Sequence, residues 1–410
     1  MYCVHIDCNS YFASCEVATR PELDGKPVVV ANDVRVIGGA VQANEWGRAT
    51  SSGVILALNA EAKALGLVRG VPLFKVMPLL KEKGVMICGA DHHKYKLISQ
   101  AIMRSVVEQG IVQDFVQYSV DEFFGTLPLD DPAEVRFYTA KVRDMIQSVH
   151  RIPVGCGCSQ TNTLSKVATH FAKHYKGYGG ICVLTPEKRE KALSMLAVGE
   201  VWGVGRQNRK HLESKGIRTA LDLANMRQDE VERLLNTAGV RTWMELNGRQ
   251  AVTLGSHERQ KSIMQSHTFV EMITDKERLK SEVAVFATSC AATLRKQESL
   301  CNAVTLFIRT NRYRDDLSQY GNQATCRLQR PTADTTVIIK AATTLLDKIF
   351  RQGYQYKQAG VVLGGIVADE GHQLDLFSAD EDERRRKLMN MVDEINGRYG
   401  RGSITFARGQ

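Results

Sequence analysis

Acidic side chains follow two apolar stretches of the sequence, and their types and positions suggest chemistry. Asp7 comes directly after the apolar segment 2–6, and Asp121 and Glu122 come after the segment 114–120. Carboxylates packed together repel one another unless cations neutralise them, and Mg²⁺ prefers oxygen ligands of this kind. Two such ions can activate a hydroxyl and stabilise a leaving pyrophosphate in an in-line phosphoryl transfer. The three acids therefore predict a two-metal site, provided that the two segments lie side by side.

The same acids have a simpler interpretation, because a carboxylate at the end of a strand is often only solvated. This interpretation applies most to Asp7 taken alone. It applies less to Asp121 and Glu122, which lie in the string YSVDEFF between apolar flanks. Spacing along the sequence does not show whether the two sites meet.

The elements that would position these acids alternate through the first 175 residues. Apolar runs predict strands, and helical periodicity or helix-forming composition predicts helices. The predicted strands are 2–6, 27–31, 85–88, 114–120, 123–127 and 154–158, and the helices are 10–18, 59–65, 95–108, 132–150 and 161–175. No element is assigned to residues 32–54, which are rich in Gly, Ser and Asn. The alternation indicates an α/β or α+β fold.

Three further parts follow a glycine-rich break at 176–180. Residues 186–248 are predicted to be helical, and the polar residues 249–262 are typical of a linker. Residues 262–367 follow the order strand, helix, strand, strand, helix, strand, which predicts a sheet backed by two helices. A tail that begins near Asp369 carries the string QLDLF and then a run of mixed charge.

Composition limits the class of protein. The chain has 410 residues, of which 43% are hydrophobic and 24% charged, as expected for several globular domains and not for a disordered or collagen-like chain. Its net charge of +9 favours a polyanionic partner, although a merely basic enzyme fits the charge equally well. Ten cysteines without a C-x-x-C pair favour reduced thiols over a zinc ribbon or a disulfide framework. With no predicted signal peptide or membrane span, we expect a cytoplasmic location.

Motifs in the same order resemble those of Y-family DNA polymerases, in particular the UmuC-type branch. The strings HIDCNSYFASCE (5–16) and YSVDEFF (118–124) resemble the two catalytic motifs of that family. VGCGCSQTNTLSKVATHFAK (154–173) resembles the following strand and helix, and VWGVGRQNRKHLESKGIRTALDLA (201–224) resembles the thumb hairpin. NAEAKALG (59–66) and NGRYGRGSITFA (396–407) resemble the UmuC-type branch. The resemblance therefore spans almost the whole chain.

The resemblance implies an α+β multidomain fold, that of a right-hand polymerase. The implied parts are a ferredoxin-like palm at 1–24 and 82–175, small fingers at 25–81, a helical thumb with a helix-hairpin-helix at 176–248, a linker at 249–261, a little finger of a β-sheet and two helices at 262–368, and a C-terminal tail at 369–410. It also implies error-prone translesion DNA synthesis in the DNA damage (SOS) response. The reaction would be nucleotidyl transfer from a dNTP to a primer 3′-hydroxyl, without proofreading.

The resemblance also assigns roles at the implied catalytic centre. Two Mg²⁺ ions would be held by Asp7, the backbone carbonyl of Cys8, Asp121 and Glu122. The incoming nucleotide would be bound by Tyr11, Phe12 (the steric gate against ribonucleotides), Lys63 and Lys166. One departure concerns Leu58, which stands where the UmuC-type branch tends to have Arg and which puts the roof of the fingers in doubt.

Two sets of basic residues and one peptide are implied to bind partners. The DNA-binding set is Gly203, Gly205, Arg206, Arg209, Lys210, Arg309, Arg312 and Arg314, although a basic face is often only solvated. The peptide resembles the bacterial sliding-clamp motif and consists of Gln373, Leu374, Asp375, Leu376 and Phe377. The implied partners are template–primer DNA, a dNTP and the sliding clamp (its beta subunit). A UmuD-like accessory protein and a recombinase filament are left open.

Two other interpretations remain at this point. A nucleotide cyclase on a similar palm would also place acids at strand ends, but this chain has a predicted helix-hairpin-helix and a clamp peptide. The second is a catalytically weak scaffold that binds DNA and the clamp. The presence of all three acids and of the aromatic pair argues against it, and only Leu58 favours it.

Overall fold

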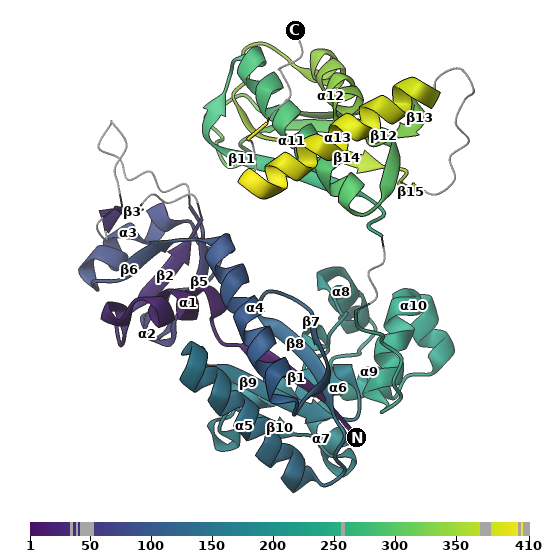
Figure 1. Ribbon diagram of the computed structural model, residues 1–410. Coiled ribbons are helices and arrows are strands. Elements are labelled where there is room, and N and C mark those ends of the chain that lie inside the picture. Colours follow the sequence, from purple (N-terminus) through teal and green to yellow (C-terminus); the bar gives the residue numbers. More distant parts are fainter. Residues whose placement is uncertain are drawn as a thin grey trace. The chain divides into compact units, whose positions relative to one another are not determined.

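The computed structural model describes residues 1–32, 36–37, 40–41, 53–255, 259–369, 379–400 and 403–404 (Figure 1). The chain divides into two compact units, Met1–Ser256 and His257–Gln410. Within the described residues, no helix is long and apolar enough to cross a membrane. All ten cysteines are described and are free thiols.

A five-stranded sheet lies at the centre of the first unit. Its order is β10 (Ile181–Val183), β9 (Val154–Ser159), β1 (Tyr2–Cys8), β8 (Glu122–Leu127) and β7 (Gln113–Gln117). The central strand β1 pairs antiparallel with both β8 and β9, and six of its seven residues are buried. Both faces of β1 are buried. This explains why its residues are almost all apolar and do not alternate between apolar and polar. The strand β10 extends this sheet beyond residue 175, where the palm was predicted to end.

Helices pack against this sheet, and acidic or hydroxyl side chains cap several of them. The helices are α4 (His92–Gln109), α5 (Pro132–His150) and α6 (Asn162–His174), whereas α1 (Tyr11–Thr19) contacts strands of the smaller sheet described next. Asp91, Asp131 and Thr161 accept hydrogen bonds from backbone amides in the first turns of α4, α5 and α6. A Cβ atom on Gly157 would lie 2.2 Å from the Ser165 carbonyl oxygen. Glycine at this position of β9 therefore permits the close approach of α6.

A smaller three-stranded sheet follows β1 and α1 in the chain. Its order is β5 (Ile55–Leu58), β2 (Val28–Ala31) and β6 (Met86–Gly89), accompanied by the turn η1 (Pro21–Leu23) and the helices α2 (Ala60–Ala64) and α3 (Leu73–Glu82). The short strands β3 (Val36–Ile37) and β4 (Ala40–Val41) pair with each other. Because β6 pairs with β2, the segment after residue 82 contributes to this sheet and not only to the palm as predicted.

A helical region completes the first unit. It contains η2 (Lys176–Tyr178), α7 (Pro186–Met195), η3 (Val198–Glu200), α8 (Arg206–Ser214), α9 (Ala220–Ala224) and α10 (Gln228–Leu246). Its core is shared with α6, through residues such as Leu164 and Phe171. The buried Glu245 carboxylate on α10 accepts hydrogen bonds of 2.7 Å from the Thr163 amide and hydroxyl. The helices predicted for this region are thus anchored to the helix that follows β9.

The second unit confirms the predicted order of strands and helices. The elements are β11 (Ile263–Ile273), α11 (Lys276–Lys296), β12 (Ser299–Thr310), β13 (Gly321–Thr332), α12 (Thr335–Ile349), β14 (Tyr356–Gly364) and β15 (Val367–Ala368). The main sheet has the order β11-β14-β12-β13, and β15 pairs with β12. Buried side chains of α11 and α12, such as Leu294 and Leu346, form one core with buried strand residues such as Val304 and Val361.

A last helix, α13 (Ala379–Tyr399), was not predicted from the charged run in the tail (Figure 1). Met389 and Val392 on this helix are buried, with exposed fractions of 2% and 7%. The Asp393 carboxylate accepts two hydrogen bonds, of 2.6 and 2.7 Å, from the Arg295 guanidinium of α11. The C-terminal segment therefore packs as part of the second unit.

Candidate active site

The register of the central sheet brings two of the predicted acids together. Asp7 lies directly opposite Glu122 in the antiparallel pairing of β1 with β8. Asp7 is the penultimate residue of β1, whereas the sequence predicted that it follows the strand. Side chains directly opposite each other in an antiparallel pair project to the same face of the sheet. The condition for a shared site, that the two segments lie side by side, is therefore met for Asp7 and Glu122.

Asp121 lies in the turn that joins β7 to β8, and not at the end of a strand reaching residue 120. The Asp121 carbonyl oxygen accepts a 2.9 Å hydrogen bond from the Cys8 amide, which ties this turn to the end of β1. Its carboxylate accepts a 2.6 Å hydrogen bond from the Ser119 hydroxyl. The three acids thus come from two neighbouring strands and the turn between β7 and β8.

Two lysines of α6 contact the paired carboxylates. Lys166 Nζ lies 2.7 Å from Glu122 Oε1, and Lys173 Nζ lies 2.5 Å from Asp7 Oδ1. Seven residues correspond to about two helical turns, so both lysines lie on the same side of α6. Lys166 had been singled out from the sequence, whereas Lys173 had not. The spacing of seven residues between them was the signal that could have found it.

Burial and these ammonium groups have opposite effects on the pKa values of the two carboxylates. Burial raises the pKa of Asp7 above its ordinary value, and the Lys173 ammonium opposes this rise. Burial alone would also raise the pKa of Glu122, but His5 and Lys166 together lower it to about 2. The Glu122 carboxylate is therefore ionised at neutral pH, as a ligand for a cation must be.

A buried histidine lies beside Glu122. His5 is 1% exposed, and its Nε2 lies 3.6 Å from Glu122 Oε1. Its Nδ1 shares a 2.8 Å hydrogen bond with the Thr169 hydroxyl of α6. Burial lowers the pKa of His5, so the ring is neutral at physiological pH. His5 was not predicted from the sequence, because a histidine inside an apolar strand has no distinctive pattern.

Three aromatic rings surround the Lys166 ammonium. Its Nζ lies 5.1 Å from the Tyr118 ring centroid, 5.6 Å from that of Phe124 and 5.2 Å from that of Trp202. The Trp202 indole N–H also donates a 3.2 Å hydrogen bond to the Tyr118 hydroxyl. Cation–π attraction of this kind restricts the ammonium group. Trp202 immediately precedes the glycines of the thumb motif. Through its contact with Lys166, which pairs with Glu122, it links the helical region to the carboxylate site.

The predicted steric gate, Phe12, stacks on a second aromatic ring. Phe12 is half-buried near the start of α1 and stacks on Tyr95 of α4, with ring centroids 4.5 Å apart and an interplanar angle of 16°. Tyr95 is fully buried, and its hydroxyl donates a 2.7 Å hydrogen bond to Glu16. Glu16 is in turn paired with Lys94 at 2.6 Å and with Arg20. This network fixes the ring on which Phe12 rests.

The structure corrects the prediction for the Tyr11 side chain. Tyr11 is 4% exposed, and its hydroxyl donates a 2.6 Å hydrogen bond to the Tyr95 carbonyl oxygen. A hydroxyl committed to a buried carbonyl does not face a triphosphate. A contribution of Tyr11 to nucleotide binding would have to come from its backbone amide at the N-terminus of α1.

The other predicted nucleotide contacts differ in their surroundings. Lys63 is exposed, and its Nζ donates a 2.7 Å hydrogen bond to the Ser10 hydroxyl just before α1. It therefore reaches the region between Asp7 and Phe12. Leu58, in contrast, is 4% exposed and packs in the core of the small three-stranded sheet. Its side chain is therefore part of that core.

The glycines of the thumb motif have different roles. Gly203 has a φ of +88°, in the left-handed region, and a Cβ atom there would lie 2.9 Å from the Thr242 hydroxyl oxygen. Gly205 precedes α8 with a φ of −75°, and a Cβ atom would meet nothing within 4 Å. Of the predicted basic residues, Arg206 and Lys210 are exposed, and Arg209 is paired with Glu213 at 2.7 Å.

The predicted arginines of the second unit also differ from one another. Arg309 is exposed on β12, with its guanidinium 4.9 Å from the Phe307 ring centroid. Arg312 donates a 2.6 Å hydrogen bond to the Tyr313 hydroxyl. Arg314 makes a two-pronged ion pair with Asp316, at 2.7 and 2.6 Å. Arg309 and Arg312 thus keep their charge available, whereas that of Arg314 is already neutralised.

Two predicted features are not located by the structure. The peptide at residues 373–377 lies outside the described residues. Among the residues that are described, no group of three or more His, Cys, Asp or Glu side chains is close enough to hold a metal ion as it stands. Asp7 and Glu122 instead contact the ammonium groups of Lys173 and Lys166. These carboxylates therefore attract cations.

Comparison with known proteins gives consistent matches along the chain. Residues 6–170 match the impB/mucB/samB family, residues 260–376 match the impB/mucB/samB family C-terminal domain, and residues 386–410 match a domain of unknown function. Protein UmuC of Salmonella typhimurium is 33% identical over 408 residues, which cover 98% of this chain and 92% of that protein. DNA polymerase IV 1 of Bacillus subtilis is 27% identical over 403 residues, 97% of this chain and 90% of that protein.

Solved structures with a similar fold include a Y-family DNA polymerase chimera of Dbh and Dpo4. It has a TM-score of 0.66 and 20% identity, and the match covers 90% of this chain and 100% of that one. An insertion ternary complex of Dbh DNA polymerase has a TM-score of 0.52 and 19% identity, with the same coverage. At this level of identity the likeness concerns the fold. It confirms the predicted α+β right-hand architecture.

Proposed function

The chain belongs to the impB/mucB/samB family, and from this premise we propose that it is a template-directed DNA polymerase of the Y family that performs translesion synthesis. The observation that carries the proposal is the register of β1 and β8, which sets Asp7 opposite Glu122 with Asp121 in the adjoining turn. The named relatives include DNA polymerase IV 1, and the structural neighbours are DNA polymerases. The reaction would be nucleotidyl transfer from a dNTP to a primer 3′-hydroxyl.

The donor set at this site fits Mg²⁺. Asp7, Asp121, Glu122 and the backbone carbonyl of Cys8 would hold two ions, because these are hard oxygen ligands. When bound, the ions supply a lowered pKa for the primer hydroxyl and stabilisation of charge on the leaving pyrophosphate. Lys166 and Lys173 contact Glu122 and Asp7 in the structure. These two lysines would bind the triphosphate as point charges.

The chain's own residues would select and orient the nucleotide. The Phe12 ring, held by Tyr95, would exclude a 2′-hydroxyl by occupying the space below the sugar. Lys63 approaches the start of α1 and would contribute a further positive charge to triphosphate binding. The aromatic rings around Lys166 would restrict its ammonium to the neighbourhood of Glu122, in position to contact the triphosphate.

DNA would be held without reading its sequence. The amides at the Gly203–Gly205 turn and the exposed Arg206 and Lys210 would contact phosphates in the first unit. Arg309 and Arg312 would do so in the second unit. Arg209 and Arg314 are paired with acids, so we expect smaller contributions from them.

The proposals about biological role and protein partners are based on the family to which the chain belongs and on the sequence of its tail. We propose error-prone synthesis in the DNA damage (SOS) response in the cytoplasm, without proofreading, because no stretch of the sequence resembles an exonuclease. Residues 373–377 would bind the sliding clamp. A UmuD-like accessory protein and a recombinase filament are further proposed partners.

Primer extension with Mg²⁺ on undamaged and abasic templates tests the proposal. Asp121→Ala should reduce the extension rate at least about 10²-fold, because charge stabilisation is lost mainly in the transition state. DNA binding, measured by fluorescence anisotropy, should be unchanged. Asp144→Ala, a change at an exposed carboxylate on α5, is the matched control and should extend primers normally. Normal extension by the Asp121 variant would show that the site is not catalytic.

A further inference from the structure

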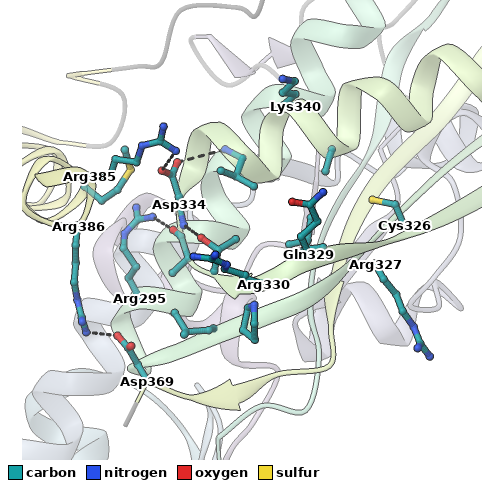
Figure 2. Close-up of a pocket in the computed structure, with 18 of the residues that line it drawn as sticks. Arg295, Cys326, Arg327, Gln329, Arg330, Asp334, Lys340, Asp369, Arg385 and Arg386 are labelled. Atoms are coloured by element: carbon teal, nitrogen blue, oxygen red, sulfur yellow. Dashed lines mark hydrogen bonds and ion pairs between the residues drawn. The ribbon is translucent and has the colours of Figure 1, made fainter. Parts of the chain in front are cut away.

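A groove of about 1070 Å³ lies in the second unit and is lined by residues of β13, α12 and α13 (Figure 2). Acids bind two arginines that α13 contributes to it. Arg385 pairs with Asp334 and Arg386 pairs with Asp369, as the dashed lines in Figure 2 show. These pairs join the C-terminal helix to the rest of the unit and stabilise its packing. Side chains suited to a different role lie on α6 of the first unit.

Two histidines stand on consecutive turns at the end of α6. His170 and His174 are four residues apart, so they project from the same side of the helix. Their rings stack with centroids 4.2 Å apart and an interplanar angle of 27°. His170 is half-buried and His174 is exposed. Two imidazoles at this spacing on one helix face can bind the same metal ion.

The hydrogen bonding of His174 leaves one ring nitrogen available to a metal. Its Nδ1 lies 2.8 Å from the His170 carbonyl oxygen. Because a carbonyl oxygen can only accept, Nδ1 carries the hydrogen, and in the neutral ring Nε2 keeps its lone pair. Histidines that bind metals commonly donate their second ring N–H to a backbone carbonyl or another acceptor in this way. His174 is therefore held in a form that can coordinate an ion.

His170 is also able to coordinate at neutral pH. Its ring makes no hydrogen bond to any residue that the structure describes. Burial and the neighbouring His174 lower the pKa of His170, and the charge of Glu200 opposes this shift. The neutral imidazole is the form that binds metals. Two bonds of about 2.1 Å from one ion reach nitrogens up to about 4 Å apart, which suits two rings stacked in this way.

The charges around the pair suit a cation. The helix α6 ends at His174, and the C-terminal end of a helix carries partial negative charge. Glu200 of η3 adds a carboxylate close enough to affect the pKa of His170. The adjacent Lys173 is paired with Asp7, which offsets its repulsion. No set of three His, Cys, Asp or Glu ligands is assembled in the part of the chain that the structure describes, so water would fill the remaining positions.

We propose that His170 and His174 bind a divalent transition-metal ion such as Zn²⁺ or Ni²⁺. These ions favour imidazole ligands, whereas Mg²⁺ favours the oxygen ligands of the carboxylate site. The ion bridges the last turn of α6, beside Lys173, and stabilises the end of the helix that contacts Asp7. The proposal does not depend on the polymerase activity, because the binding of the metal is measured directly.

Isothermal titration calorimetry of the full chain with Ni²⁺ tests the proposal. Excess Mg²⁺ is present throughout, so that carboxylate sites contribute little to the signal. We expect saturable binding in the micromolar range. His170→Ala and His174→Ala should each weaken it about tenfold or more, because each change removes one of two imidazole ligands. His211→Ala, a change at an exposed histidine of α8, is the matched control and should bind Ni²⁺ as the unchanged chain does.

Thermal unfolding gives a second measurement. A ligand that binds the folded state stabilises it, so Ni²⁺ at about a hundred times its dissociation constant should raise the melting temperature of the unchanged chain. The control His211→Ala should show the same rise, and His170→Ala and His174→Ala should show much less. Binding that survives in both of the latter variants would overturn the proposal, since the ion would then lie elsewhere. Equal weakening by His211→Ala, or no saturable binding, would also overturn it.

Discussion

At the scale of single residues, we expect discrimination between nucleotides to depend on the Phe12 ring, which its stacking partner holds in place. Phe12 is stacked on Tyr95, whose hydroxyl is held by Glu16. Phe12→Ala should therefore admit a 2′-hydroxyl. We expect the ratio of ribonucleotide to deoxyribonucleotide incorporation, measured by single-nucleotide primer extension, to rise on the order of 10²-fold.

Tyr95, on which Phe12 stacks, provides the comparison for that experiment. Tyr95→Leu should raise the same ratio by a smaller factor, because Phe12 remains but loses its stacking partner. Tyr11→Phe removes a buried hydroxyl that donates to the Tyr95 carbonyl oxygen, so it should leave the ratio unchanged. An unchanged ratio in Phe12→Ala would mean that the ring is only part of the core.

The thiols provide a second test at the residue scale. Nine of the ten cysteines are buried, and Cys326 is half-buried. Burial raises the pKa of Cys182 to about 11 and of Cys301 to about 12. Because the thiolate is the reactive form, these groups stay protonated and unreactive until the pH approaches those values. At pH 8, a disulfide reagent should modify one thiol of the native protein quickly and the rest only after unfolding. Fast modification of several thiols would contradict the packing described here.

At the scale of elements, the turn before α8 gives a matched pair of glycines. Gly203→Ala should cost roughly 1–2 kcal/mol, because its φ of +88° is unfavourable for a residue with a Cβ atom. It should also weaken DNA binding, since Trp202 and the amides of this turn would shift. Gly205→Ala has an ordinary φ and open space, so it should change the melting temperature little. Urea unfolding curves and anisotropy with duplex DNA measure both effects, and equal stability of the two variants would contradict the argument.

The same elements show what a sequence can and cannot predict. Strands and helices around Asp7 and Glu122 were predictable, because apolar runs and helical periodicity are local patterns. The contact of Trp202 with Lys166 was not, since it depends on how the helical region packs against α6. The helix α13 was missed because its buried face consists of few residues, such as Met389 and Val392, within a strongly charged run. The burial of the Tyr11 hydroxyl could likewise not be predicted, because a family motif gives the residue type and not its hydrogen-bond partner.

At the scale of the whole molecule, the buried apolar residues that the structure describes form four clusters, three before residue 256 and one after it. The second unit has its own core of strand and helix residues, which includes Val304 and Leu346 and is closed by the Arg295–Asp393 pair. A unit with a complete core should fold alone. Residues 257–410, produced separately, should therefore unfold in one cooperative transition by circular dichroism. A gradual loss of signal would show that the second unit depends on the first.

The division into two units also predicts how DNA affinity responds to salt. Each phosphate contact releases counterions, so the logarithm of the affinity falls with the logarithm of the salt concentration by about 0.9 per contact on duplex DNA. Replacing Arg309 and Arg312 with Gln should reduce this slope by up to about 2 in the full chain, because their charges are available. Arg314→Gln should change it less, since that guanidinium is already bound to Asp316. Residues 1–256 alone should keep the carboxylates and α6, and therefore extend primers slowly, with weaker binding and a shallower slope than the full chain. A slope that stays the same without the second unit would place all of the phosphate contacts in the first, and the arginines of β12 and the following loop would then have no part in holding DNA.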